Sequence, residues 1–264
     1  MLAAYAQYWR INLLTFLEYR ANFLMWLGFT IVYHATAIGA LYVTMRQFPT
    51  MNGWDFREMF FLYALWMLGH EIHNAFFFNV VSVPDFVREG RFDRFLVRPL
   101  DTLFQVLTVP AQLFPDGLFL AIVTFVVATI AVGVRVDAGF IALVPLVAIG
   151  GALIDFGISL MSATIAFWFV RVDTLRWVLI SLEQDFTRYP VSIYGRGVQI
   201  VLAFLLPFAF MNYFPATYFL QKVDLGLHLN PVVGLLTPVI GLAWFGVAYA
   251  FWRHGLNHYQ GTGS

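Results

Sequence analysis

Several long apolar segments constrain this chain more than any other feature of its sequence. A helix needs about 20 predominantly apolar residues to cross roughly 30 Å of hydrocarbon, and several segments reach that length. Charged residues make up only 11% of the chain and hydrophobic residues 61%, whereas soluble domains contain about 25% charged residues. The sequence therefore predicts an all-α integral membrane protein that crosses the bilayer several times.

The hydropathy pattern predicts six membrane-spanning helices in one domain, residues 1–260. Before them, residues 2–20 carry apolar side chains along one helical face, which is typical of an amphipathic helix at the membrane surface. Residues 171–189 are expected to be a polar loop containing a short helix. Residues 212–220, broken by Pro215, are expected to form a re-entrant hairpin, and residues 261–264 a flexible tail. The expected spans are residues 23–45, 60–83, 113–134, 140–170, 191–210 and 232–252.

The basic residues between these spans predict the orientation of the chain. Cytoplasmic loops of membrane proteins carry an excess of Lys and Arg. With a cytoplasmic N-terminus, four basic residues fall outside, namely Arg46, Arg57, Arg135 and Lys222, and eleven fall inside. Both termini are therefore expected in the cytoplasm. The eleven are Arg10, Arg20, Arg88, Arg91, Arg94, Arg98, Arg171, Arg176, Arg188, Arg196 and Arg253.

Several functions are excluded by composition and spacing. No stretch between the apolar segments exceeds about 25 residues, which is too short for a soluble nucleotide-binding domain of even ~50 residues. Lys222 is the only lysine and follows Gln221, whereas a phosphate-binding P-loop needs Gly before its Lys. Acidic and basic residues balance at 15 each, so no nucleic-acid partner is expected. We expect no catalytic residue and no bound cofactor, and if ATP powers the protein, another chain binds it.

A polar and aromatic face runs along the second expected span. An ionised acid at a helix centre costs about 3 kcal/mol on the insertion scale, so Glu71 should face protein or water. The face is interpreted either as the lining of a substrate path or proton relay, or as a hydrogen-bond cluster that orders the bundle. His70 and His73 lack the HExxH spacing of zinc proteases, so no metal site is expected. The face comprises Tyr63, Trp66, His70, Glu71, His73 and Asn74.

The fourth expected span carries a stripe of small residues with one acid in its middle. Such stripes let helices approach closely. We interpret the stripe as a packing seam in which Asp155 accepts hydrogen bonds from a neighbouring helix. The seam comprises Ala148, Ala152, Asp155 and Ser159.

Residues 84–101 alternate basic, acidic and aromatic side chains. Anchoring at the membrane surface with weak local salt bridges is one interpretation. Anchoring does not require exposed Phe side chains, however, and these fit a surface that docks into a groove of another protein. We favour a partner site. Its expected residues are Arg88, Arg91, Phe92, Arg94, Phe95 and Arg98.

Four segments resemble the ABC-2-type permeases of bacterial ABC exporters, in the branch without a fused ATPase. They are EYRANFLMWL at 18–27, GRFDRFLVRPLDTLFQ at 90–105, RYPVSIYGRG at 188–197 and NYFPATYFL at 212–220. The resemblance implies six transmembrane helices, an N-terminal elbow helix and a cytoplasmic coupling helix at about 84–98. It also implies that the broken hairpin at 212–220 lies on the outer face.

The same resemblance implies the assembly and its cargo. Two permease subunits, identical or paralogous, would pair in the bacterial inner membrane among its lipids with two ABC ATPase subunits that bind ATP and Mg. The substrate path would lie at the permease dimer interface, lined by spans two and five. Family members export drugs, antibiotics, lipids or polysaccharides.

Two other classes of protein remain open at this point. A proton-coupled secondary transporter would use Glu71, His73 and Asp155 as its relay, but such folds usually contain internal repeats and none is visible. An integral-membrane enzyme would need convergent catalytic groups, and Glu71 and Asp155 are expected to be the only deep acids, too few to name a reaction. Copurification with a separate ATP-binding subunit discriminates best between these classes.

Overall fold

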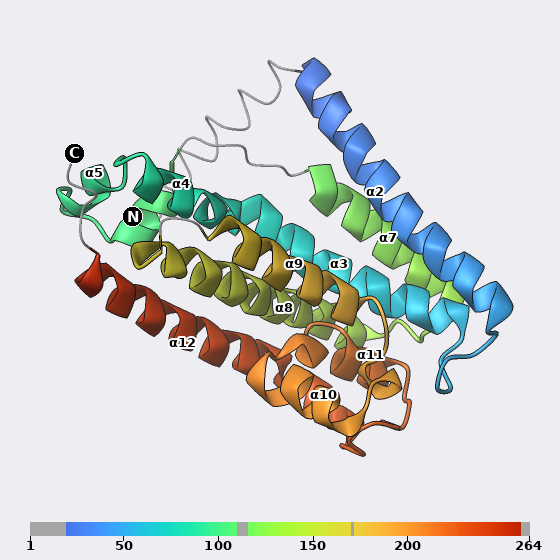
Figure 1. Cartoon of the computed structure of the whole chain (residues 1–264). Helices are drawn as coiled ribbons and strands as arrows, with labels where there is room; N and C mark the ends of the chain where they lie inside the picture. The colour runs from blue at the N-terminus through green and yellow to red at the C-terminus, as the bar shows by residue number, and fades with distance from the viewer. Residues whose placement is uncertain (1–19, 110–115, 170–171, 260–264) are drawn as a thin grey trace.

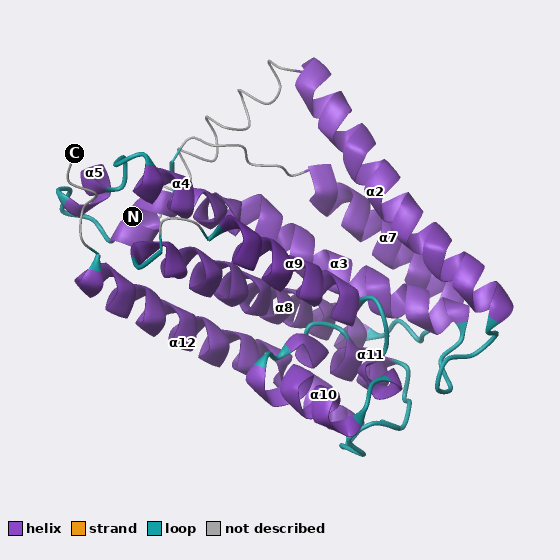
Figure 2. Ribbon diagram, viewed as in Figure 1, coloured by secondary structure: helices purple, strands orange, loops and turns teal. Residues whose placement is uncertain are grey.

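The computed structural model describes residues 20–109, 116–169 and 172–259 (Figure 1). Within these ranges the chain is a helical bundle without a β-strand (Figure 2). Of the helix expected at residues 2–20, all but the last residue lies outside the described residues, as does the expected tail at 261–264.

Long helices run side by side through the bundle (Figure 1). Among the described residues, three segments are long and apolar enough to cross a membrane: Leu24–Gln47, Ala138–Phe167 and Pro231–His258. These positions overlap the first, fourth and sixth expected spans. The remaining long helices overlap the second and third. The bounds are α2 Arg20–Gln47, α3 Phe56–Phe77, α7 Asp116–Val132, α8 Ala138–Thr164 and α12 Thr237–His258.

Local sequence explains where two of these helices begin. Asp55 accepts a hydrogen bond from the backbone N–H of Glu58, and the Glu58 side chain accepts one from the backbone N–H of Asp55. This reciprocal pair satisfies two donors that the first turn of α3 leaves free. Asp137 caps α8 by accepting from the Phe140 N–H. Short elements link the long helices: η1 Phe78–Ser82, α4 Val83–Arg88, α5 Asp93–Leu96, α6 Thr102–Leu107, η2 Ile165–Phe167, η3 Val191–Ile193 and η6 Pro231–Leu236.

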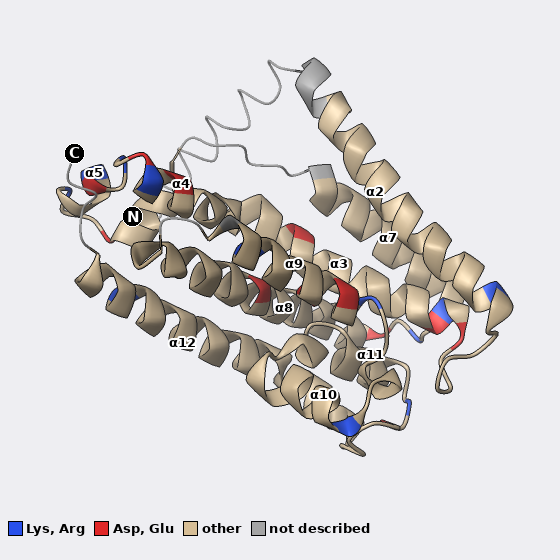
Figure 3. Ribbon diagram, viewed as in Figure 1, with Lys and Arg blue, Asp and Glu red and all other residues tan. Residues whose placement is uncertain are grey.

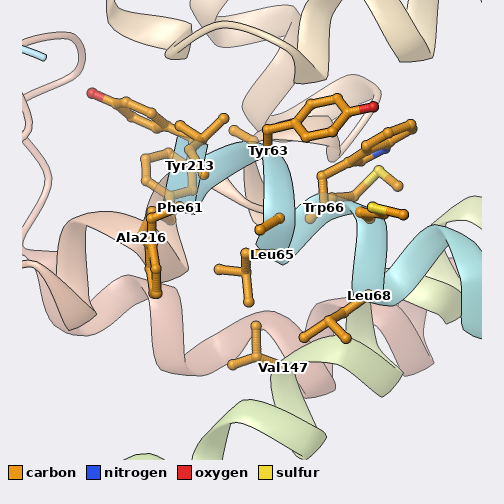
Figure 4. Packing of buried hydrophobic residues seen from close by; sticks show 14 of the residues in the cluster. Phe61, Tyr63, Leu65, Trp66, Leu68, Val147, Tyr213 and Ala216 are labelled. Carbon is orange, nitrogen blue, oxygen red and sulfur yellow. The ribbon is translucent and has the colours of Figure 1, made fainter. Parts of the chain in front are cut away.

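Helix α3 forms the centre of the bundle. It packs against α7 and α8, and most of its side chains are buried. Leu65 and Leu68 extend from it toward Val147, Phe61 lies beside Ala216, and Trp66 points to the other side of the helix (Figure 4). Because α3 is covered on several sides, polar residues in its middle must find partners within the protein.

Small residues bring α8 close to both of its neighbours. A Cβ added to Gly69 of α3 would lie 3.2 Å from the Ala152 backbone N of α8. On the other side of α8, a Cβ on Gly241 of α12 would lie 2.4 Å from the Gly150 carbonyl oxygen. Glycine is required at 241 because the atom it approaches belongs to the backbone and cannot rotate away.

The structure of residues 173–187 differs from the sequence prediction, which expected a polar loop with a short helix at residues 171–189. They form one helix, α9 (Asp173–Thr187), that packs along α8. Near its start, Arg176 donates to the Val81 carbonyl, 2.6 Å away. Just beyond its end, the Asn52 side chain donates to the Ser192 carbonyl, 2.8 Å away. Helix α9 thus runs from the end of the bundle that holds residues 84–101 to the end that holds residues 46–57.

This course of α9 also corrects the expected position of two arginines. Arg188 and Arg196 flank Ser192 and lie at the 46–57 end, not at the 84–101 end. Among the described residues, the division of basic residues becomes seven at the 84–101 end against six at the 46–57 end. The bias toward the 84–101 end keeps its direction but shrinks to one residue.

The fifth expected span, residues 191–210, is wrong as a single helix. Residues 196–205 and 208–219 form two helical pieces bent by 75°. The break falls at Leu206–Pro207, where proline removes a backbone donor and disfavours a helical residue before it. After the second piece, Lys222 donates to the Gly53 carbonyl, 2.7 Å away, so the bent pair as a whole starts and finishes at the 46–57 end. They comprise α10 Arg196–Ile200, the π-helix η4 Val201–Leu205, η5 Phe208–Phe210 and α11 Tyr213–Phe219.

Candidate functional site

Polar side chains from four helices meet in the middle of the bundle. Two of the acids, Glu71 of α3 and Asp155 of α8, lie on helices that carry no other charge within several turns of them. Figure 3 shows such isolated acidic positions on the long helices. Burying such groups in an apolar medium is costly unless they are paired. The group, called here the central polar cluster, comprises His34 of α2, Tyr63, Trp66, His70, Glu71, His73 and Asn74 of α3, Asp155 of α8 and Glu183 of α9.

One half of the central polar cluster surrounds Glu71. Nε2 of His34 lies 3.3 Å from Oε1 of Glu71, and Nδ1 of the same ring lies 2.7 Å from the Tyr63 hydroxyl. The Asn74 amide donates to Oε2 of Glu71 at 3.4 Å. The buried carboxylate therefore has polar partners on two helices, α2 and α3.

The other half surrounds Asp155. Nδ1 of His70 lies 2.7 Å from Oδ2 of Asp155, and the His70 ring stacks on Trp66 with centroids 4.7 Å apart. The Trp66 indole donates to Oε1 of Glu183 at 3.1 Å. Asp155 and Glu183 also interact with each other. Two buried carboxylates repel each other when both are ionised, so a proton or a cation between them would be favourable.

His73 differs from the rest of the cluster. It is 3% exposed, and neither ring nitrogen has a hydrogen-bond partner. Its Nδ1 lies 3.5 Å from Oδ2 of Asp155. Buried polar side chains almost always have a partner, so this ring is an exception that calls for an explanation.

A cavity of about 310 Å³ lies between α2 and α3 beside the central polar cluster. Aromatic side chains form much of its wall, and His34 and Glu71 supply polar groups. Of the six residues expected to face a substrate path, His70, Glu71 and Asn74 line this cavity, whereas Tyr63, Trp66 and His73 are buried and are not part of its lining. The aromatic lining comprises Trp26, Phe29, Tyr33 and Phe78.

Two cluster residues are not recognised from the sequence, His34 and Glu183. His34 is a single imidazole in the middle of an apolar span, and its position there is the available signal. Glu183 lies in the segment expected to be a loop, so its burial, at 2% exposed, is not foreseen. The expectation that Glu71 and Asp155 are the only deep acids is wrong for this reason.

The residues expected to form a packing seam on α8 are buried and face neighbouring helices. Ala148 and Ala152 lie against Gly69 of α3. Asp155 lies about one turn after Ala152 on α8, and its carboxylate contacts His70 and His73 of α3. The exposed fractions of Ala148, Ala152, Asp155 and Ser159 are 4%, 1%, 2% and 8%.

The segment at residues 84–101 departs from the expectation of exposed phenylalanines. Phe92 is 0% and Phe95 2% exposed, and Phe92 packs against Phe167 and Trp252 with ring centroids 5.0 and 6.0 Å away. These rings belong to an internal core at this end of the bundle. They therefore do not form the outer surface that the sequence predicts.

The outer surface of this segment is formed by other residues. Arg88, Arg91, Arg94 and Arg98 are exposed. Beside them, three apolar side chains are also exposed, and Val97 reaches 82%. We call this set the exposed apical surface: Arg88, Arg91, Arg94, Leu96, Val97, Arg98 and Leu100.

Comparison with known proteins gives one match. A family model described as ABC-2 family transporter protein matches residues 31–263, a range that includes the central polar cluster and the exposed apical surface. The search of curated proteins and the search of solved structures each found no match.

Proposed function

The chain belongs to the ABC-2 family of transporter proteins, and we propose that it is the permease subunit of an ATP-driven exporter whose ATP is hydrolysed by separate subunits. It is a multi-pass membrane protein of the ABC transporter type. The family match over residues 31–263 is the observation that carries the proposal, because it covers nearly the whole described bundle. Drugs, antibiotics, lipids and polysaccharides are the proposed substrate classes.

In the proposed orientation the 84–101 end faces the cytoplasm of the bacterial cell, with both termini inside. Helix α9 is the fifth crossing, and the bent pair at residues 196–219 dips into the membrane from outside and returns. The larger number of arginines at the 84–101 end supports this orientation. The contact between Asn52 and Ser192 supports placing the start of the bent pair at the 46–57 end, which is the outer end in this orientation.

We propose that the cavity between α2 and α3 opens toward the substrate path at a permease dimer interface. Its aromatic walls would contact apolar parts of a substrate, while Glu71 and His34 would contact polar parts. Helix α2 presents many exposed apolar side chains, with Leu24, Phe29 and Val32 each more than 60% exposed. In a membrane such a face is covered by lipid or by a second permease subunit.

The exposed apical surface is the proposed docking site for the ATPase subunits. Val97, Leu96 and Leu100 would enter an apolar groove of the ATPase, and the surrounding arginines would contact its acidic rim. Phe92 and Phe95 support this surface from below by packing against the body of the permease. Their proposed role is therefore to hold the docking segment in place.

A proton-coupled transporter is the alternative, because Glu71, His73 and Asp155 lie within one cluster. Transport by the complex in proteoliposomes separates the two. The proposal predicts transport that needs ATP and persists when an uncoupler removes the proton gradient. Transport that stops with the uncoupler and ignores ATP would contradict it.

Glu71→Gln tests the proposed path on the same complex. This change should alter ATP-dependent transport while the melting temperature stays near that of the unmutated protein, because the amide keeps the shape of the side chain. Asp185→Asn is the control, since the Asp185 side chain is 71% exposed. If Glu71→Gln lowers only the melting temperature, the residue is part of a packing cluster and does not line a path.

A further inference from the structure

His70 and His73 of α3 meet Asp155 of α8 in the centre of the bundle. One potential ligand atom from each residue lies within 4.8 Å of the other two. The two histidines alone lack a metal-binding spacing in the sequence, but the packing of α8 adds a carboxylate to them. We propose that these three residues bind a divalent transition-metal ion of the zinc type. This inference does not depend on the transport function.

The unpartnered His73 ring is the first argument for this site. The side chain is buried, and both ring nitrogens lack a hydrogen-bond partner. Its Nδ1 points to within 3.5 Å of Oδ2 of Asp155. A metal ion between the two would use the imidazole lone pair and remove the exception to the rule that buried polar atoms are paired.

Coordination distances are the second argument. Zinc binds histidine nitrogen at about 2.0–2.1 Å and carboxylate oxygen at about 2.0–2.2 Å, which separates tetrahedral ligand atoms by roughly 3.4 Å. In the structure, Oδ2 of Asp155 lies 2.7 Å from Nδ1 of His70 and 3.5 Å from Nδ1 of His73, distances close to this separation. Small side-chain rotations would therefore make room for the ion.

The charges around the site are the third argument. Asp155 and Glu183 are both buried and interact with each other. In the described part of the chain only His70 and His73 form ion pairs with Asp155, and no Lys or Arg forms a salt bridge with either acid. A divalent cation would compensate the negative charge that both acids bring into the membrane interior. Glu183, held by Trp66, would orient Asp155 as an outer partner of the metal ligand.

The site also has a route for the ion. His70 lines the cavity of about 310 Å³ between α2 and α3, together with Glu71 and Asn74. An ion entering this cavity meets His70 first and His73 and Asp155 behind it. Two imidazoles and one carboxylate are a ligand set used by catalytic zinc sites, and the same set also binds non-haem Fe(II).

Zinc binding by the full chain tests the proposal. The chain is purified with an affinity tag that contains no histidine, stripped with a chelator and titrated with Zn²⁺ against a chromophoric competitor. One Zn²⁺ per chain is expected. His73→Gln and Asp155→Asn should each weaken binding more than about tenfold, and Glu183→Gln about tenfold or more.

The chain offers a matched control on its surface. It has no cysteine and six histidines, and His254 and His258 form an exposed pair with ring centroids 4.3 Å apart. The double variant His254→Gln/His258→Gln should keep the site. Absence of stoichiometric zinc, or loss of zinc in this double variant alone, would overturn the proposal.

A second measurement needs no variant in the core. X-ray absorption of the His254→Gln/His258→Gln protein loaded with Zn²⁺ should report two imidazole ligands and at least one oxygen ligand. A zinc spectrum without imidazole scattering would overturn the proposal even if His73→Gln and Asp155→Asn fail to fold.

Discussion

Nδ1 of His70 on α3 lies 2.7 Å from Oδ2 of Asp155 on α8, and the residue before His70 is Gly69, which packs closely against the α8 backbone. A Cβ at Gly69 would lie 3.2 Å from the Ala152 backbone N. The small residues thus bring the helices together at the point where the buried imidazole must reach the carboxylate. The central polar cluster depends on this packing.

Close approach of α8 and α12 predicts that Gly241→Ala destabilises the bundle. The added Cβ would lie 2.4 Å from the Gly150 carbonyl oxygen, and overpacking of this kind costs about 1–3 kcal/mol or more. Gly246→Ala, on the same helix with nothing within 4 Å of its Cβ, should have little effect. Equal melting temperatures of the two variants in detergent would rule out close packing at Gly241.

The position of Ser192 beside Asn52 predicts the accessibility of introduced cysteines. The chain has no native cysteine, so single replacements can be labelled without background. Arg196→Cys and Thr50→Cys should react with a membrane-impermeant thiol reagent from the same side, and Glu89→Cys from the opposite side. Glu89 is used because Gly90 has φ 66°, which strains other residues. Labelling of Arg196→Cys together with Glu89→Cys would contradict the course of α9.

Burial of Phe92 predicts that its removal acts on stability. Phe→Ala in a packed core costs about 3–5 kcal/mol, so Phe92→Ala should lower the melting temperature markedly. Val97→Ser, at a side chain that is 82% exposed, should leave it unchanged. If Phe92→Ala has the melting temperature of the unmutated protein, the ring does not support the docking segment.

The hydrogen bond between Tyr259 and Asp93 is expected to stabilise the 84–101 end of the bundle in a pH-dependent way. Burial and a 2.9 Å hydrogen bond to Asp93 raise the pKa of Tyr259 to about 12, above the usual value near 10. The neutral phenol is favoured in the folded state, so its contribution is complete below about pH 10 and is lost as the pH rises through about 12. Tyr259→Phe should therefore be less stable than the unmutated protein at neutral pH, and the difference should vanish above that range. A difference in melting temperature that is constant with pH would contradict this.

Much of the fold follows from hydrophobicity alone. The apolar segments at 23–45, 140–170 and 232–252 overlap helices α2, α8 and α12, because a long apolar run has few alternatives to a helix in lipid. The amphipathic α9 is not recognised as part of the bundle, since its polar residues are paired by partners distant in sequence, such as Trp66 with Glu183.

The sequence predicts only part of the central polar cluster, because several of its residues come from other helices. Helical spacing on α3 brings His70, Glu71 and His73 to one region, but it does not reveal which neighbours they meet. His34 and Glu183 come from other helices, and only packing brings them to the cluster. The exposed Phe expected at 84–101 illustrates the limit: alternation of Arg and Phe indicates an amphipathic segment, but it does not indicate that Phe92 faces the body of the protein.

Isolation of the intact complex from its native membrane tests the central claim most directly. The chain carrying a photo-reactive residue in place of Val97 is cross-linked in the membrane, purified in mild detergent and analysed by mass spectrometry and for ATP hydrolysis. The account predicts that a separate ABC ATPase is cross-linked to Val97 and copurifies with ATPase activity, and that a residue placed at Thr50, at the other end of the bundle, gives no such product. A complex without any ATP-binding subunit, or an ATPase cross-linked at Thr50 and not at Val97, would contradict it.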